Sequence, residues 1–223
     1  MSSELGRIER PLAEQFRGER KLYLVPLVFA PSNPDPEYAD IYERYWSGVR
    51  EHLLKLELRI GSVARVYHES VGRSGEEGLQ EADRINPKSA SIARGKVEAG
   101  ASFEAVEEEE LVAESFDWQR CIMVGLESRK VAELALKGYQ EATRQRFEVI
   151  AQRIDQTLRP EESGLLFISE DHRVQFPSDI RVFYVSPPAL DDIHRWLRDH
   201  RSRARREAGG QEAASETADR QEK

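Results

Sequence analysis

The first 70 residues contain a strand, a helix and a second strand in succession, and this order restricts the fold more than any other feature of the sequence. Residues 21–30 are apolar at both odd and even positions, which is typical of a strand buried on both faces. Apolar residues then recur every three or four positions from Tyr38 to Ile60, which predicts an amphipathic helix beginning at Pro36. Residues 63–70 predict a second strand. Because two strands joined by a helix normally run parallel, we expect an α/β fold.

Further strand signals lie in the last third of the chain. Residues 164–169 and 180–185 are short apolar runs bounded by turn residues, and residues 102–106 are compatible with one more short strand. Pro26 cannot donate to a strand ladder, which predicts that the first strand lies at a sheet edge or carries a bulge. We predict a small, mostly parallel sheet of about four strands surrounded by several helices, with the strands at residues 21–30, 63–70, 164–169 and 180–185.

The longest helical pattern covers residues 129–158. Its apolar positions step by three and four, and a helix of that length would be roughly 45 Å long. Two alternatives remain open, namely an isolated dimeric coiled coil and a long helix that packs across its own domain. We favour the second. Four consecutive acids at positions 107–110 are expected at a helix N-terminus, and Cys121 is expected at a core position of the preceding helix, between Trp118 and Ile122.

Composition suggests one domain between two charged ends. Residues 1–20 alternate acidic and basic side chains and are interpreted as a charged leader, and residues 21–204 as a single α/β domain. Residues 205–223 contain no side chain able to anchor a core, so we expect a disordered tail.

The net charge and the lengths of the apolar runs argue against several classes of protein. The chain has 33 Lys and Arg against 41 Asp and Glu, and this net charge of −8 argues against a protein devoted to gripping phosphate backbones. Only the arginines between Arg198 and Arg206 could contact nucleic acid, and we favour the interpretation that they are cations suited to a helix C-terminus. No apolar run reaches the roughly 20 residues of a membrane span, and no signal-peptide pattern precedes residue 21. We therefore expect a soluble cytoplasmic protein without a membrane partner.

No phosphate-binding loop, dinucleotide fingerprint, serine elbow or zinc-protease motif occurs in the sequence. Candidate site residues can therefore be chosen only from their positions relative to the predicted strands. In open α/β sheets, ligands bind outside the carboxyl ends of the strands, where this chain places His68, Glu69, Asp171 and His172. Imidazole and carboxylate groups suit general acid–base catalysis, and His68 with His172 would suit a divalent metal. The competing interpretation is a polar turn at Asp171 and His172, with His68 exposed on its strand.

Two functional hypotheses follow. The first is an interaction or regulatory protein that uses the long amphipathic helix at residues 129–158 to dock a protein partner or a second copy of itself. The second is a small metal-assisted hydrolase, in which Zn, Mn or Fe held at the carboxyl edge of the sheet activates a water.

Overall fold

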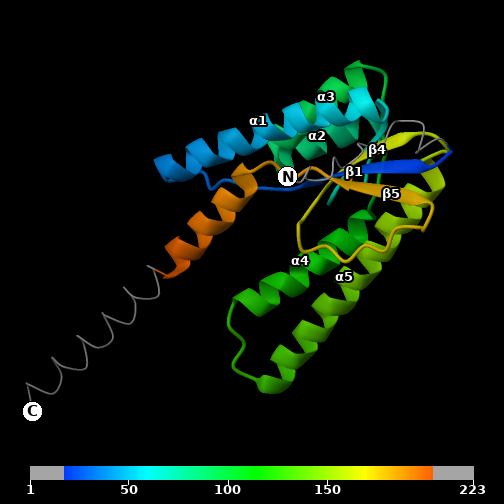
Figure 1. The fold of residues 1–223 in the computed structure, drawn as a ribbon. Coiled ribbons are helices and arrows are strands. Elements are labelled where there is room, and N and C mark those ends of the chain that lie inside the picture. The colour runs from blue at the N-terminus through cyan, green and yellow to red at the C-terminus, as the bar shows by residue number, and fades with distance from the viewer. Residues whose placement is uncertain (1–17, 203–223) are drawn as a thin grey trace, which may run out of the picture. The chain divides into compact units, whose positions relative to one another are not determined.

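The computed structural model describes residues 18–202. Among these residues, five parallel strands form one sheet in the order β3-β2-β4-β1-β5 (Figure 1). The strands are β1 Arg20–Pro26, β2 Val63–His68, β3 Ser102–Phe103, β4 Ser163–Ile168 and β5 Ile180–Tyr184. The predicted α/β fold with a parallel sheet is confirmed, and the short strand β3 extends the four expected strands to five.

Both alternatives predicted from Pro26, an edge strand or a bulge, are wrong, because β1 lies between β4 and β5 and pairs with each in continuous register. The strand ends at Pro26 rather than at residue 30. On the β4 side, Lys21 and Leu27 donate their N–H groups to Glu162 and Ile168. On the β5 side, pairing ends where the N–H of Val185 reaches the carbonyl of Leu24 at 2.8 Å. Since alternate residues of a strand face opposite neighbours, Pro26 faces the β5 side beyond that last bond and interrupts no ladder.

Five helices lie wholly within the described residues. They are α1 Pro36–Arg59, α2 Gly75–Ile85, α3 Pro87–Glu98, α4 Glu109–Met123 and α5 Arg129–Thr157. Residues 189–202 are also helical up to the end of the described chain. None of these helices is long and apolar enough to cross a membrane.

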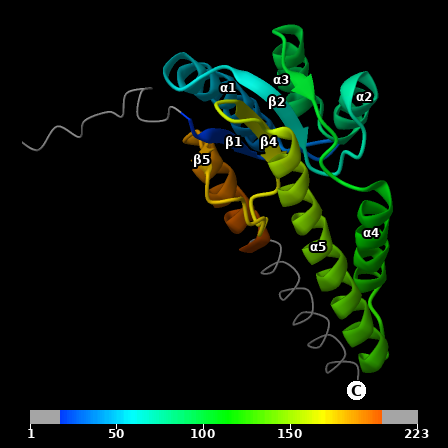
Figure 2. The ribbon, with the colours of Figure 1, turned by 90° about the vertical axis from the view of Figure 1, so that its right-hand side faces the viewer.

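Side-chain alternation assigns each strand residue to one of two faces of the sheet. One face carries Leu22, Leu24, Tyr67, Leu166 and Ile168, which form a buried cluster with Ile150, Ile154 and Leu158 at the end of α5. The opposite face carries Tyr23, Val66, Leu165 and Phe167, all fully buried. Figures 1 and 2 show α5 against the first face and α2 and α3 on the other side of the sheet. Both faces are therefore covered, as a parallel sheet requires.

The two halves of α5 pack differently. The second half lies on the sheet, where Ile150 and Ile154 are fully buried and Phe147 packs against the same cluster. The first half runs beside α4 (Figure 2), and the indole of Trp118 on α4 covers Gly138 of α5. We call α4, the turn at residues 124–128 and residues 129–145 of α5 the helical arm. The predicted long helix is confirmed as α5, whose second half packs on the sheet and whose first half packs against α4.

The chain divides into two compact units. Within the described residues, the first unit consists of residues 18–29 and 49–185 and contains the whole sheet. The second unit consists of residues 30–48 and 186–202. In the second unit the rings of Tyr38 and Trp196 lie 4.7 Å apart.

The predicted leader and tail lie mostly outside the described residues, since residues 1–17 and the tail at 205–223 are not among them. Arg20, expected at the end of the leader, instead opens β1 and is nearly buried. Its guanidinium makes ion pairs of 2.7 Å with Asp155 and with Asp179. Of the predicted arginine cluster, Arg198 and Arg201 are exposed on the last helix, and the arginines beyond residue 202 lie outside the described chain.

Candidate functional site

The carboxyl ends of β2 and β4 meet at one edge of the sheet, where His68 pairs with Phe167. Glu69 and Ser169 directly follow these strands. The Ser169 N–H donates to Glu69 Oε2 at 2.6 Å, and the Ser169 hydroxyl donates to Oε1 at 3.0 Å. The candidate acid Glu69 is therefore held in place by the neighbouring strand end.

The residue after Glu69 adopts a strained backbone conformation. Ser70 has φ 67°, a left-handed value that few residues other than glycine adopt readily. It occupies the third position of a turn closed by the Val71 N–H and the His68 carbonyl at 3.2 Å. The Ser70 N–H donates to Glu107 Oε1 at 2.7 Å, which stabilises this conformation.

Glu107 belongs to a buried ionic network with Arg146 of α5. Arg146 donates from Nε to Glu107 Oε2 at 2.6 Å and from Nη2 to Oε1 at 2.8 Å. It also donates to the hydroxyl groups of Ser115 and Ser70, each at 3.2 Å. Its Nη2 lies 3.8 Å from Glu69 Oε1. One cation therefore ties the strand ends, the loop before α4, and α4 itself to α5.

Burial and neighbouring charges shift the ionisation of this network. Burial alone lowers the pKa of Arg146, but hydrogen bonds and attraction from Glu107 outweigh it, and the pKa is raised. Burial raises the pKa of Glu69, and repulsion from Glu107 adds to the increase, although hydrogen bonds from Ser169 oppose it. Burial is therefore the main reason that Glu69 holds a proton more readily than an exposed glutamate does.

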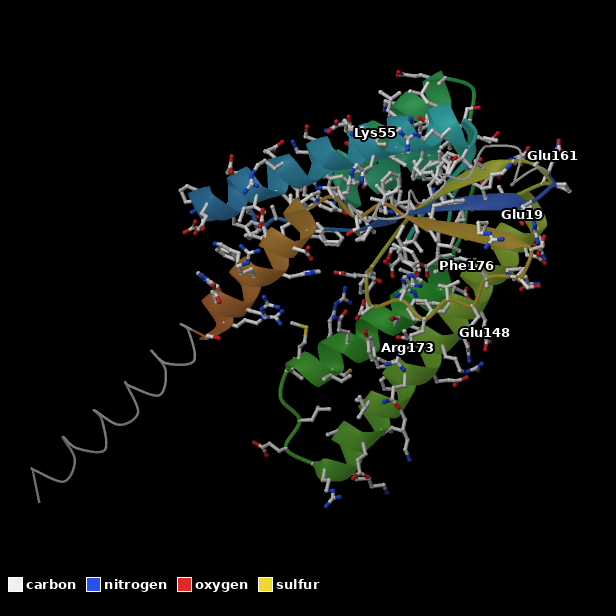
Figure 3. All side chains as sticks on the ribbon, viewed as in Figure 1. Glu19, Lys55, Glu148, Glu161, Arg173 and Phe176 are labelled. Carbon is white, nitrogen blue, oxygen red and sulfur yellow. The ribbon has the colours of Figure 1, made fainter. Side chains whose placement is uncertain are left out.

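A cavity of about 840 Å³ opens between these strand ends and α5, and we call it the carboxyl-edge cavity. From the sheet edge it is lined by Glu69, Ser169 and Asp171. In Figure 3, Glu148 of α5 and Arg173 of the loop after β4 lie on the same side of the sheet, and both line this cavity. From α5 it is also lined by Thr143, whose buried Oγ1 has no hydrogen-bond partner among the described residues.

The structure brings two of the four predicted site residues to this cavity. Glu69 and Asp171 line it, whereas His68 and His172 do not. His172 instead accepts a hydrogen bond from the Val174 N–H at 3.3 Å and packs its ring against Phe176.

His68 is fully buried, so the expectation of an exposed histidine is wrong. Its Nδ1 lies 2.7 Å from the Glu69 carbonyl and its Nε2 lies 2.9 Å from the Ser89 hydroxyl. A carbonyl only accepts, so Nδ1 carries the proton. Burial lowers the pKa of His68 to about 4, which keeps the ring neutral at neutral pH. A metal at His68 would have to displace one of these bonds, and residues 18–202 contain no group of three His, Cys, Asp or Glu placed to hold a metal ion.

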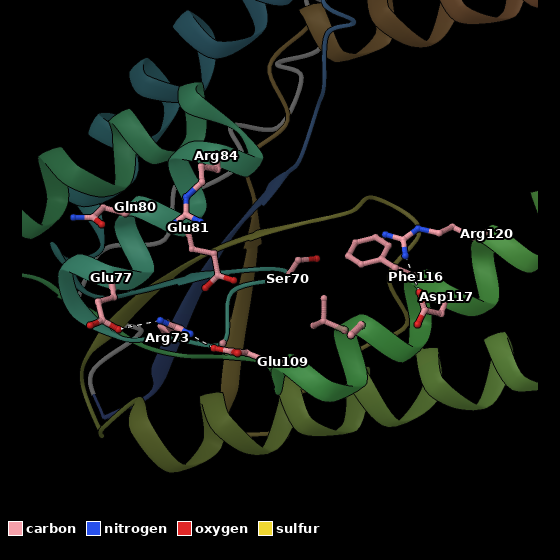
Figure 4. Close-up of a pocket in the computed structure, with 13 residues that line it drawn as sticks. Ser70, Arg73, Glu77, Gln80, Glu81, Arg84, Glu109, Phe116, Asp117 and Arg120 are labelled. Carbon is pink, nitrogen blue, oxygen red and sulfur yellow. Dashed lines mark hydrogen bonds and ion pairs between the residues drawn. The ribbon is translucent and has the colours of Figure 1, made fainter.

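A second cavity, of about 620 Å³, lies between α2, the loop after β2, and α4, and we call it the α2–α4 cavity (Figure 4). Arg73 of the loop makes ion pairs with Glu109 at 2.7 Å and with Glu77 at 3.4 Å. Glu81 of α2 is different, because its buried Oε2 has no hydrogen-bond partner among the described residues. Ser70 lines this cavity, and its hydroxyl accepts a hydrogen bond from Arg146 of the buried ionic network.

The helical arm carries most of the exposed large hydrophobic residues of the described chain. Seven of the eleven exposed large hydrophobic residues in the described chain lie on it, namely Phe116, Ile122, Met123, Val124, Val131, Leu134 and Leu136. Met123 and Val124, at the turn between the two helices, are 76% and 74% exposed. Cys121 is exposed, so the expectation of a core position is wrong.

Sequence reasoning missed the central pair of the network. The run of four acids predicts a helix N-terminus for Glu107, but α4 begins at Glu109, and Glu107 is buried before it. Arg146 falls between Thr143 and Ile150, on the face of α5 that turns to the sheet. A cation on a buried helix face needs a buried acid as its partner. The position of Arg146 on the apolar face of this helix is therefore the sequence signal that could have identified the pair.

Comparison with known protein families, with curated proteins and with solved structures finds no match to this chain.

Proposed function

We propose that this chain is an interaction protein whose α/β sheet carries the helical arm as a docking element, and that the arm binds a second copy of the chain. The observation that carries the proposal is the concentration of exposed apolar side chains on the arm. These side chains lie on both helices of the arm and at the turn between them, and large exposed apolar surfaces mark interaction sites. The docking surface differs from the one first expected, since the second half of α5 is buried on the sheet.

The distribution of charge on the arm favours a second copy in antiparallel orientation. Near the sheet, a groove between α4 and α5 is lined by four glutamates, and we call it the acidic groove: Glu108, Glu110, Glu114 and Glu148, with Leu111 and Val149 at its floor. Near the turn, α5 begins with the exposed cations Arg129 and Lys130 and carries Lys137 two turns later, and Arg129 pairs with Glu133 at 2.9 Å. Antiparallel arms place the basic end of one against the acidic groove of the other, and the same contact then occurs twice, as twofold symmetry requires.

The buried network explains how the arm is held. Arg146 lies where α5 leaves the sheet, and its bonds to Glu107 and Ser115 fix α4 and α5 at that point. A fixed arm loses little conformational entropy on binding, which favours association. Burial of the exposed apolar side chains would supply about 25 cal/mol for each Å² removed from water.

Cross-linking through cysteines tests both the association and its orientation. The chain has one cysteine, Cys121, exposed near the turn of the arm, and Gln145 lines the acidic groove. In antiparallel arms, Cys121 of one chain lies near position 145 of the other. The variant Gln145→Cys, treated with a short bismaleimide, is expected to give a covalent dimer.

Two controls accompany this variant. The unmodified chain is expected to give no covalent dimer, because its two Cys121 residues lie at opposite ends of the paired arms. Leu58→Cys places the second cysteine at an exposed position on α1 outside the arm, and is also expected to stay monomeric on a denaturing gel. Dimers formed by the unmodified chain would show that the arms meet turn to turn. No dimer from Gln145→Cys would contradict the proposal.

A further inference from the structure

We propose that the turn of one helical arm docks in the carboxyl-edge cavity of a second copy, where the Met123 side chain inserts between aromatic side chains of α5. This docking rests on the proposed function, because it requires antiparallel arms. It adds the place on the partner that receives the turn. The occupant of the cavity is then a defined segment of this chain, residues 122–124.

The first observation is the exposure of the turn at the end of the arm, which lies away from the sheet (Figure 2). Met123 is 76% exposed and Val124 is 74% exposed, and Leu58 is the one large hydrophobic residue of the described chain that is more exposed. Apolar side chains at the end of a hairpin are stabilised when a partner removes them from water. A methionine side chain is unbranched and flexible, so it adapts to a cavity of irregular shape.

The second observation is the register that antiparallel arms impose. The chain reverses direction between α4 and α5, and it reverses again between the two copies, so α4 of one copy runs parallel to α5 of the other. The proposed pairing of Cys121 with position 145 continues in that direction and places Met123 level with Phe147. Phe147 lines the carboxyl-edge cavity. The turn of one arm therefore arrives beside the cavity of the other copy.

The third observation is that the acidic groove and the carboxyl-edge cavity adjoin each other on α5. Glu148 lines both of them, and Figure 3 shows this side chain on α5. The α2–α4 cavity shares no lining residue with the acidic groove. A partner arm whose basic end lies in the groove therefore reaches the carboxyl-edge cavity along α5, and this favours it over the α2–α4 cavity as the receiving site.

The wall of the cavity suits a thioether side chain. From α5 it contains Tyr139, Phe147 and Ala151, and its volume is about 840 Å³. Sulfur at about 5 Å from an aromatic ring makes a favourable contact, and the remaining methylene groups of methionine pack on apolar atoms. The wall also contains three carboxylates and three guanidinium groups, so their charges cancel. An apolar turn therefore meets no excess of charge of one sign.

The test is a search for magnetisation transfer between copies in a mixed sample of the full chain. Met123 is the only methionine besides Met1, so labelling of methionine methyl groups with ¹³C gives a simple spectrum in which Met123→Leu identifies the signal. One preparation is deuterated and carries labelled methionine, and the other is protonated at its tyrosine and phenylalanine rings. The two are mixed at low concentration and then concentrated. We expect cross-peaks from the Met123 methyl group to both kinds of ring, which can arise only between copies.

Three substitutions locate the contact and measure its effect. Tyr139→Leu is expected to abolish the cross-peaks to tyrosine. Phe116→Leu is the matched control, because it removes a ring of the α2–α4 cavity and should leave the cross-peaks unchanged. Met123→Ala should raise the Kd of the dimer by roughly tenfold or more, since two side chains leave the interface of each dimer.

Sedimentation velocity on the same mixed sample separates failure of the docking from failure of the proposed function. A monomeric sample contradicts both. A dimer without cross-peaks between Met123 and partner rings overturns the docking and leaves the association of the arms in place. The same conclusion follows if Met123→Ala leaves the Kd unchanged, or if Phe116→Leu abolishes the cross-peaks to phenylalanine.

Discussion

Arg146 and Glu107 form a two-bond ion pair that is almost completely removed from solvent. The bonds are 2.6 Å and 2.8 Å long, and the side chains are 9% and 0% exposed. Glu107 in turn holds the strained Ser70 by its backbone N–H. The pair therefore connects the root of the helical arm to the carboxyl edge of the sheet.

Removal of one partner of this pair should be strongly destabilising. Glu107→Gln keeps the shape of the side chain but leaves the guanidinium of Arg146 buried without its counter-charge. Such a change costs about 3–5 kcal/mol in free energy of unfolding. Urea denaturation measures this loss. Glu107→Leu combined with Arg146→Met removes both charges and should cost less than either single change. A double variant as unstable as the sum of the two would show that the residues act separately.

Glu69 should reduce stability at neutral pH. Its pKa is raised in the folded state, so the folded chain binds the proton more readily than the unfolded chain between the ordinary value of 4.5 and the raised value. Stability from this group therefore falls as the pH rises through that window. Glu69→Gln should gain stability relative to the unmodified chain on going from pH 4 to pH 7. An unchanged difference between the two pH values would contradict the raised pKa.

His68 should make the protein sensitive to acid. Its folded pKa of about 4 lies below the ordinary value of 6.5, so the unfolded chain binds more protons between these values. Stability therefore falls as the pH is lowered from 6.5 to 4. His68→Gln is expected to be less stable at neutral pH, because it loses packing, but to lose less stability over this range. Equal losses in the two proteins, measured by urea denaturation, would show that another group causes the acid sensitivity.

Two glycines provide a matched test of helix packing. At Gly138 an added Cβ would lie 2.4 Å from the indole of Trp118, whereas at Gly95 of α3 it would meet nothing within 4 Å. Gly138→Ala should destabilise the chain by about 1–3 kcal/mol and expose Trp118. Gly95→Ala should stabilise it by about 0.5–1 kcal/mol through helix propensity alone. Thermal unfolding with tryptophan fluorescence distinguishes these outcomes, and a stabilising Gly138→Ala would contradict the contact.

The sequence predicts the main elements of the sheet because a strand buried on both faces has a distinctive pattern. β1 and β4 are buried along their whole length, and both were recognisable as short apolar runs. The order of the strands in the sheet cannot be predicted from the residues of any one strand or connection. β4 lies between β1 and β2, although these two are joined by α1, and nothing in the intervening sequence indicates a third strand between them. Pro26 leads to a wrong prediction for the same reason. A central strand can contain this proline only because the pairing with β5 ends before it, and the local sequence does not show where β5 ends.

The candidate site could be predicted only as a location. The rule that ligands bind at carboxyl strand ends identified Glu69 and Asp171, which do line a cavity there. It failed for His68, because alternation along β2 turns this residue to the opposite face, where it meets Ser89 of α3.

Sedimentation velocity over a range of concentrations tests the central claim, that the arm joins two copies of the chain. The unmodified chain is expected to sediment as a dimer that dissociates on dilution. Leu134→Glu places a charge within the apolar surface of the arm and should sediment as a monomer. Leu58→Glu is the matched control, because Leu58 is 79% exposed on α1, and it should remain dimeric. A monomeric unmodified chain at every concentration, or a Leu134→Glu variant that stays dimeric, would contradict the account.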